Sequence, residues 1–202
     1  MAPTPERVVL ASASPMRAHL LETAGVAFSI EPAAIDESAI KREMRLAGRS
    51  ASECAKALAR AKAAAVSACD LDALVIGADQ LLDAGDEWHD KPKTLAEARL
   101  QLQRLRGRTH GLATAVCVLR GGERLWDAAS RPELTMRHFS DAFLDRYIAA
   151  EGEALLGSVG AYRLEARGIQ LFSRMAGDHF AVLGLPLFEL LEFLRSRSAL
   201  LS

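Results

Sequence analysis

Two serine hydroxyls and a guanidinium occur close together in the stretch LASASPMR, at Ser12, Ser14 and Arg17. An apolar run precedes this stretch, which predicts a turn from a first strand into a first helix. Since Ser14 suits a helix N-cap and Pro15 the first helical position, the simplest interpretation is a capped helix. The alternative is an anion-binding site, because free N–H groups, the helix dipole, hydroxyls and an arginine would meet there. The turn by itself leaves both interpretations open.

A lysine interrupts the apolar face of an alanine-rich segment. The capping-box spacing at Ser50 starts a predicted helix that extends to about Cys69, and Lys62 falls on its apolar stripe. A lysine that faces inward is costly unless a carboxylate or another anion meets its ammonium. The alternative is that the stem packs while the charged head reaches water.

An aspartate follows a predicted buried strand. The run Leu74–Ala78 is continuously apolar, as in a strand covered on both faces, and Asp79 comes directly after it. The carboxylate is therefore expected at the carboxyl end of a central strand, where ligands usually bind in open α/β sheets. An ordinary turn aspartate is the alternative.

Two charged loops complete the set of residues that could do chemistry. Asp36 and Glu37 follow a second predicted strand (26–30), and Lys91 follows a predicted hairpin whose turn is 83–86. Taken alone, each loop is usually a solvated turn. Combined with the residues above, they supply cations for the oxygens of a polyphosphate and carboxylates for a divalent metal that bridges them. A carboxylate near such a metal can also orient or deprotonate an attacking water.

The elements that must position these residues alternate between strand and helix in the first half of the chain, which predicts an α/β fold. The second half adds long β-rich stretches, so the sheet is expected to be mixed. The later predicted elements are a helix from Thr94 to Gly107, β-stretches over 109–119 and 125–139 joined at Gly121–Gly122, a helix over 140–152 and a helix from Pro186. No internal repeat or linker is found, so residues 1–202 are expected to form a single domain.

The composition is that of an ordinary globular chain, with 202 residues of which 50% are hydrophobic and 25% charged. Its formal net charge of −1 argues against non-specific binding to nucleic acid. The three cysteines are widely spaced and show no metal-ligand spacing, which predicts a reduced chain. No signal-peptide segment or membrane-spanning run is found, so we expect a cytoplasmic protein without a membrane partner.

The sequence resembles the Maf family over most of its length, from Leu10 to Leu187. The segments that carry the resemblance, in order, are LASASPMRAHLL, AAIDES, ALARAKA, VIGADQ, DKPKT, LRGRTHGLATAV, SVGAYRLEARGIQLF and GDHFAVLGLPL. The resemblance implies a nucleoside triphosphate pyrophosphatase that uses a divalent metal, Mg²⁺ or Mn²⁺, to hydrolyse the bond between the α- and β-phosphates. It also implies an α/β fold similar to that of inosine triphosphatases, commonly as a homodimer. In that fold an elongated bent mixed sheet is flanked by helices, and two lobes surround a cleft.

The resemblance further implies a role for each candidate residue. Asp79 matches the proton acceptor of the family, and Asp79 together with Glu37 would hold the metal. The residues that would bind the substrate are Ser12, Ser14, Arg17, Lys62 and Lys91. This assignment favours the anion site at the opening turn.

Three positions that separate substrate groups in the family are Met16, Gln80 and Glu165 here. Gln80 and Glu165 resemble the group that acts on 7-methyl-GTP, and a carboxylate suits the N1–H and amine donors of guanine. Met16 departs from the tryptophan that resembles a stacking platform in that group, which weakens cation–π selection of a methylated base. Alternatively, Glu165 only pairs with Arg163 or Arg167. The nucleobase is therefore not assigned.

Other functions fit parts of the pattern. Because the family is also linked to septum formation, the main alternative is a non-catalytic nucleotide-binding regulator of cell division. A phosphatase that releases inorganic phosphate is a further alternative. The CxxxxxR spacing of Cys54 and Arg60 is interpreted as chance, since it lies within a predicted helix without a glycine-rich loop. The histidines, including His110 and His179, have no predicted role.

Overall fold

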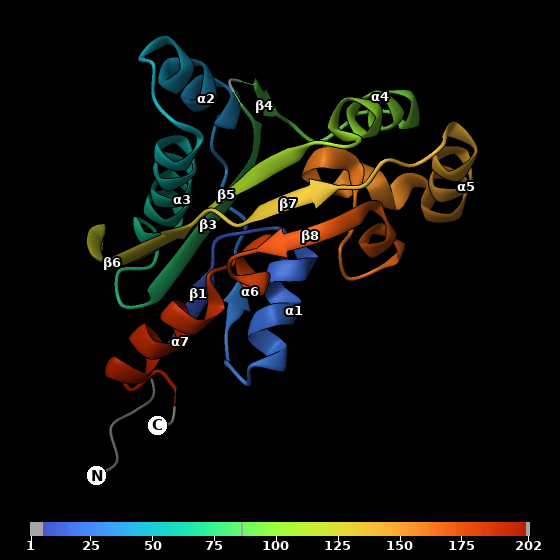
Figure 1. The fold of residues 1–202 in the computed structure, drawn as a ribbon. Coiled ribbons are helices and arrows are strands. Elements are labelled where there is room, and N and C mark those ends of the chain that lie inside the picture. Colours follow the sequence, from blue (N-terminus) through green and yellow to red (C-terminus); the bar gives the residue numbers. More distant parts are fainter. Residues whose placement is uncertain (1–5, 86, 201–202) are drawn as a thin grey trace.

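One mixed sheet forms the frame of the computed structural model, which describes residues 6–85 and 87–200 (Figure 1). Its strands are β1 (Val8–Leu10), β2 (Ser29–Ile30), β3 (Leu74–Ala84), β4 (Glu87–His89), β5 (Thr109–Arg120), β6 (Glu123–Ser130), β7 (Glu133–Met136) and β8 (Phe172–Ala176). They lie in the order β2-β1-β3-β5-β7-β8, while β4 pairs with β3 and β6 pairs with β5. The predicted turn at 83–86 includes Asp86, which lies outside the described residues.

Helices flank the sheet, and several of them begin at caps that the sequence predicts. They are α1 (Pro15–Thr23), α2 (Glu37–Leu46), α3 (Ala51–Ser67), α4 (Leu95–Leu105), α5 (Asp141–Glu151), α6 (His179–Val182) and α7 (Leu187–Ser196), with 3₁₀ segments η1 (Gly152–Gly157), η2 (Val159–Ala161) and η3 (Arg167–Leu171). The hydroxyls of Ser14, Ser50, Thr94 and Ser140 each accept a backbone N–H of the first turn. These side chains satisfy donors that a helix start otherwise leaves unpaired. No described helix is long and apolar enough to cross a membrane.

The sheet combines both strand directions. β1 runs parallel to β2 and to β3, whereas β3–β5, β5–β6, β5–β7 and β7–β8 are antiparallel. β3 and β5 pair continuously over Val75–Asp83 and Gly111–Leu119. Beyond them, β6 lies beside one half of β5 and β7 beside the other half. The predicted α/β fold with a mixed sheet flanked by helices is confirmed.

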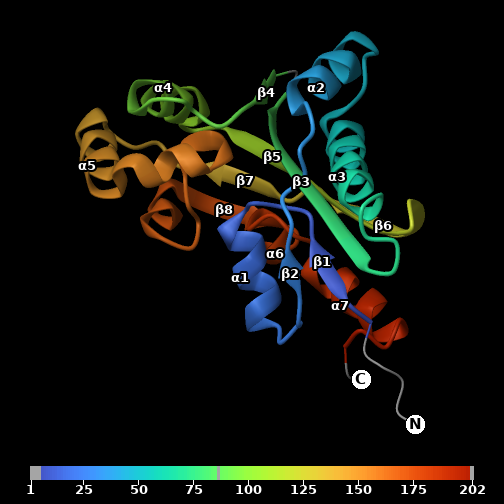
Figure 2. The ribbon, with the colours of Figure 1, turned by 180° about the vertical axis from the view of Figure 1, so that it is seen from behind.

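Two lobes are built along this sheet. In the first lobe, α3 covers one face and α1 and α7 cover the other, so each face has its own buried apolar cluster (Figures 1 and 2). In the second lobe, α4, α5 and the 3₁₀ segments enclose a third cluster around Leu82, Leu112 and Leu134. Both long strands pass through both lobes, which places the junction of the lobes at the middle of β3.

A glycine sets the distance between α3 and β3. A Cβ atom on Gly77 would lie 2.1 Å from the carbonyl oxygen of Ala59 and 2.6 Å from the backbone nitrogen of Ala63. Any other residue at this position would therefore push the helix away from the strand. The close contact brings the next inward-facing residue of α3, Lys62, within reach of Asp79.

Several elements of the structure differ from the sequence predictions. Asp79 was predicted to lie at the end of its strand, but it lies in the middle of β3. The strand continues to Ala84 because it pairs with β5 in antiparallel direction. The segment around Glu37 is not a loop but the first turn of α2, capped by Asp36. β8 was not predicted, and its residues are mostly exposed, so its apolar signal is weak.

Candidate active site

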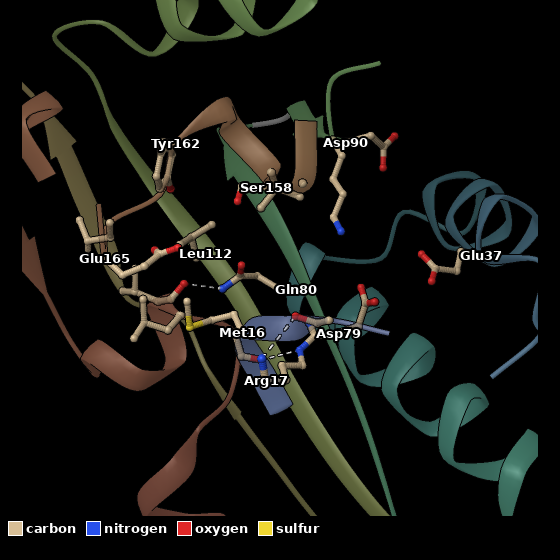
Figure 3. A pocket seen from close by; sticks show the side chains of 18 of the residues that line it. Met16, Arg17, Glu37, Asp79, Gln80, Asp90, Leu112, Ser158, Tyr162 and Glu165 are labelled. Carbon is tan, nitrogen blue, oxygen red and sulfur yellow. Dashed lines mark hydrogen bonds between the residues drawn. The ribbon is translucent and has the colours of Figure 1, made fainter. Parts of the chain in front are cut away.

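A pocket of about 370 Å³ lies where the two lobes meet (Figure 3). Its walls come from α1, α2, α3, the middle of β3 and the loop after β4 on one side. On the other side they come from β5, the segments around η1 and η2, and the end of α6. The cleft between two lobes that the resemblance implies is therefore present.

The pocket opens where one edge of β3 has no neighbouring strand. β1 ends at Leu10, which pairs with Ile76, and β4 pairs with β3 only from Leu82 onward. Asp79 and Gln80 lie between these points. Because side chains alternate along a strand, Asp79 bonds with α3 whereas Gln80 bonds with α6. One strand thus supplies both ends of the pocket.

The guanidinium of Arg17 is buried and fixed by three acceptors. Its Nε donates to the carbonyl of Gly184 at 2.8 Å, and one terminal nitrogen donates to the carbonyl of Ala78 at 2.9 Å. The same nitrogen donates to Ser12 Oγ at 3.1 Å. Arg17 therefore presents a fixed positive charge beside the N-terminus of α1, the arrangement expected of an anion site.

The two predicted serines take different positions around Arg17. Ser14 lines the pocket and caps α1, its Oγ accepting the Arg17 backbone N–H at 3.4 Å. Ser12 is buried behind the guanidinium and is not among the residues that line the pocket. Its Oγ also accepts the Ser14 backbone N–H at 3.3 Å. Ser12 thus positions Arg17, and the turn is both a helix cap and a cationic site.

Lys62 lies between two carboxylates rather than reaching out to water. Its Nζ donates to Asp79 Oδ1 at 2.5 Å and lies 2.8 Å from Glu37 Oε1. The Asp79 side chain is 7% exposed and that of Lys62 is 11% exposed. In a buried ion pair each charge compensates the other, so removal of one partner leaves the other uncompensated.

Sequence reasoning missed a second ion pair at the rim of the pocket. Lys41, one turn after Glu37 on α2, bonds Asp90 Oδ1 at 2.6 Å. Asp90 immediately precedes Lys91, so the pair joins α2 to the loop that carries the predicted lysine. The signal available in the sequence was the i, i+4 spacing of Glu37 and Lys41, which becomes informative only once α2 is known to be a helix.

Burial and charge compete over the pKa values at this end of the pocket. Burial lowers the pKa of the Arg17 guanidinium, and the nearby charges of Asp79 and Glu37 oppose that shift. Burial raises the pKa of Glu37, but the hydrogen bond and charge of Lys62 outweigh it and leave that pKa below its usual value. For Lys91, burial and then the charge of Arg17 lower the pKa. We call this set of charged groups the phosphate end, after the ligand group that the family resemblance implies.

The opposite end of the pocket is mostly apolar. The residues that line it are Met16, Leu112, Val159, Tyr162, Leu164, Val182 and Leu183, with Ser158, Gln80 and Glu165 as further polar side chains. Gln80 Nε2 donates to the carbonyls of Ala181 at 2.9 Å and Val182 at 3.1 Å. Since carbonyls only accept, the amide orientation is fixed and Gln80 Oε1 is turned to the pocket (Figure 3). We call this the base end, after the part of a nucleotide that the family resemblance implies there.

Glu165 pairs with one of the two arginines that the sequence suggested. Arg163 Nε donates to Glu165 Oε1 at 3.1 Å, whereas Arg167 pairs with Glu151 at 3.3 Å. Glu165 nevertheless lines the pocket. The ion pair and a contact with a ligand are therefore compatible.

A buried histidine supports the base end from behind. His110 Nε2 lies 2.9 Å from the hydroxyl of Tyr162, which lines the pocket. Burial lowers the pKa of His110 to about 4, so the imidazole is neutral at pH 7. Neither residue was predicted to take part. The contact joins β5 to the residue that follows η2, 52 positions later in the chain. The spacing of residues in the sequence does not predict a contact over that separation.

The carboxylates at the phosphate end suit a metal that is shared with a substrate. Glu37 and Asp79 offer oxygen ligands within reach of one ammonium, and the described residues contain no group of three or more His, Cys, Asp or Glu able to hold a metal alone. Mg²⁺ is usually bound by one or two carboxylates together with substrate phosphates. The donor set fits such an ion and does not form a complete protein cage.

Fold and pocket together define an α/β protein with a two-ended site for a small ligand, one end charged and the other apolar with hydrogen-bond acceptors. The chain belongs to the family of Maf-like proteins, whose family model matches residues 7–197. The resemblance found in the sequence is thereby confirmed.

Several relatives carry names that state an activity. A protein of Granulibacter bethesdensis named nucleoside triphosphate pyrophosphatase is 52% identical over 194 residues, or 96% of this chain and 98% of the relative. A protein of Rhodospirillum rubrum with the same name is 49% identical over 96% of each chain. A protein of Rhizobium meliloti named 7-methyl-GTP pyrophosphatase is 46% identical, over 96% of this chain and 97% of the relative. Both kinds of name therefore occur among relatives of similar closeness.

Proposed function

We propose that this protein hydrolyses nucleoside triphosphates at the bond between the α- and β-phosphates, which gives a nucleoside monophosphate and pyrophosphate. The observation that carries the proposal is the buried Asp79 carboxylate beside Lys62, Glu37 and Arg17, at the cationic end of a pocket with an apolar second end. The names of the relatives support the same activity.

The cations at the phosphate end would hold the triphosphate. Arg17 is fixed by backbone carbonyls, and Lys62 and Lys91 line the same part of the pocket. Fixed cations around phosphate oxygens stabilise the charge that develops when pyrophosphate leaves. Ser14 and the N-terminus of α1 add hydrogen-bond donors, whereas Ser12 contributes through Arg17.

Asp79 would accept a proton from the attacking water. The water oxygen would bond to the α-phosphorus, and its proton would pass to an Asp79 oxygen. The bond between the α-phosphorus and the oxygen that bridges it to the β-phosphate would break, and pyrophosphate would leave with that oxygen. Lys62 bonds Asp79 Oδ1, so a phosphate that draws its ammonium away would release that oxygen. The phosphates supply the competing anion for this change.

Glu37 and Asp79 are the residues that would hold a divalent metal, Mg²⁺ or Mn²⁺. Such an ion neutralises phosphate charge and polarises the phosphorus–oxygen bonds. Lys62 occupies the space between the two carboxylates, so metal binding and the turn of Lys62 would be coupled. Isothermal titration with Mg²⁺ and a non-hydrolysable nucleotide, alone and together, tests this expectation.

The base end favours a ring that donates hydrogen bonds. Gln80 Oε1 and the Glu165 carboxylate are both acceptors, which suits the N1–H and amine of guanine or a positively charged methylated guanine. We therefore propose 7-methyl-GTP as a substrate, in keeping with the names of several relatives. The half-buried Met16 offers an apolar surface in place of an aromatic one.

A product assay tests the proposed activity directly. The protein is incubated with Mg²⁺ and each nucleoside triphosphate, 7-methyl-GTP included, and products are separated by ion-exchange chromatography. Monophosphate and pyrophosphate in equal amounts are expected. Inorganic phosphate as the only inorganic product would show a phosphatase instead, and tight binding without turnover would show the regulator of cell division, which the names of the relatives do not favour.

Two further expectations follow from the family resemblance. Cells hold most of their nucleoside triphosphates in the cytoplasm, and we propose that location for this protein. We also propose a homodimer, which light scattering after gel filtration tests.

A further inference from the structure

An apolar groove adjoins the base end of the pocket. It has a volume of about 520 Å³ and runs between α1 on one side and α6 and α7 on the other. Three residues, Met16, Leu183 and Glu165, line both the groove and the pocket. None of the charged residues of the phosphate end lines the groove. The groove therefore adjoins the base end through these three side chains and lies away from the phosphate end.

Aromatic side chains form one wall of the groove. Phe180 and Phe188 pack edge to face with ring centroids 5.2 Å apart, and Phe188 is 68% exposed. Thr23, the last residue of α1, is exposed on the opposite wall. A flat apolar group placed between these walls would bury surface that the structure leaves in contact with water.

We propose that the groove binds a large apolar substituent of the nucleobase. Nucleoside triphosphates whose base carries such an alkyl or aryl group would then be preferred over those whose base carries only a methyl group. The inference rests on the proposed function, since it requires the base to lie at the Gln80–Glu165 end. Met16 stands at the junction, and its unbranched side chain can shift to let a substituent pass from pocket to groove. Glu165 supplies an acceptor at the same junction.

Two pairs of substrates test the groove. One pair is 7-methyl-GTP and 7-benzyl-GTP, and the other is N6-methyl-ATP and N6-benzyl-ATP, so that two edges of the purine are probed. The measurement is kcat/KM for pyrophosphate release by each substrate. We expect the benzyl compound of at least one pair to exceed its methyl counterpart about tenfold, from the burial of the added ring.

Two variants and two matched controls separate the groove from the pocket. Thr23→Trp fills the groove, and its control is Glu22→Trp on the preceding exposed residue, which lines neither cavity. Phe188→Ala removes the aromatic wall, and its control is Ile169→Ala, which is 55% exposed and lines neither cavity. Both groove variants should bring the benzyl-to-methyl ratio to about one while methyl substrates are hydrolysed as before, and both controls should keep the ratio.

The outcomes distinguish this inference from the proposed function. If both methyl substrates are hydrolysed but neither benzyl substrate reacts faster than its methyl counterpart, the inference is wrong and the proposed function stands. If neither methyl substrate releases pyrophosphate, the proposed function fails first. If Phe188→Ala changes the mass in light scattering but not the benzyl-to-methyl ratio, the groove is an interface between copies and the inference is also overturned.

Discussion

The two ends of the pocket are built in different ways. At the phosphate end, Arg17, Lys62 and Asp79 are buried, and each is bonded to groups from other elements. At the base end, the walls are mostly apolar and the hydrogen-bonding groups are few. Gln80 is fixed there by neutral acceptors, and Glu165 is exposed.

The difference separates chemistry from recognition. A buried charged side chain that has several partners cannot be removed without leaving buried polar or charged groups unpaired, so the phosphate end tolerates little change. An apolar wall with few polar groups tolerates changes of size and shape at smaller energetic cost. Substitutions at the first end should therefore abolish turnover, and substitutions at the second should redirect it.

The largest effect is expected at Asp79. Asp79→Asn keeps the size of the side chain but removes the proton acceptor, so kcat should fall about a thousandfold. Lys62 retains Glu37 as a partner, and the variant should fold. Steady-state pyrophosphate release and a thermal melt measure both properties.

Asp83→Asn is the matched control, because Asp83 is a buried carboxylate on the same strand, bonded by Arg131 at 3.0 Å and outside the pocket. It should lose about 1–2 kcal/mol of stability and change kcat less than about twofold. Equal losses of kcat in Asp79→Asn and Asp83→Asn would contradict a catalytic role for Asp79.

A large effect on stability is expected from His110 at acidic pH. Its pKa is about 4 in the folded protein and near 6.5 when unfolded, so the unfolded chain binds the proton first as pH falls. Its contribution to stability is complete above pH 6.5 and is lost between pH 6.5 and 4, by about 3 kcal/mol at about 1.4 kcal/mol per pH unit.

Urea unfolding of the protein and of His110→Phe at several pH values measures this contribution as the difference between two curves. Other groups, such as His89, whose pKa burial also lowers, act in both proteins and cancel. If the two curves run parallel from pH 7 to pH 4.5, the base end is not held by a neutral imidazole.

A moderate effect is expected from the Lys41–Asp90 pair. Lys41→Asp or Asp90→Lys should lower kcat/KM about fivefold, because the loop that carries Lys91 is no longer tied to α2. The Asp90 side chain is 57% exposed, which limits the coupling to about 1 kcal/mol. The double charge swap should recover most of the activity. Failure of the swap with both single variants impaired would mean that Lys41 itself binds the substrate.

The smallest effect is expected from Glu165→Gln at the base end. Arg163 already donates a hydrogen bond to one oxygen of the Glu165 carboxylate. The ratio of kcat/KM for 7-methyl-GTP to kcat/KM for ATP should therefore fall only about threefold, with kcat unchanged. Arg163→Gln, which frees the carboxylate, should raise the same ratio. A loss of kcat in Glu165→Gln that is equal for all nucleotides would remove the proposed distinction between the two ends.

The sequence located residues whose type conflicts with their surroundings. Lys62 on an apolar helical face and Asp79 after an apolar strand were both identified in this way, because burial of a charge needs a specific partner. Arg17 was identified from its place at a helix start. These conflicts are local, so a single sequence displays them.

The sequence did not locate residues whose role depends on contacts between distant segments. Asp90 and Tyr162 look ordinary until α2 and β5 are placed beside them. The end of β3 was also misplaced, since its pairing with β5 is a long-range contact that carries the strand past Asp79. The hydroxyl of Ser12 looked equivalent to that of Ser14 for the same reason, although only Ser14 lines the pocket.

The continuous pairing of β3 with β5 has a mechanical consequence. The strands remain in register over nine residue pairs from Val75 to Asp83, so the backbone that joins the lobes resists bending at the pocket. An enzyme whose halves cannot swing apart has to admit and release its ligands through small excursions of peripheral parts, such as α2, which has no fully buried residue. In such a molecule we expect the mobility of α2 at the rim, rather than a hinge between the lobes, to set how fast ligands enter and leave.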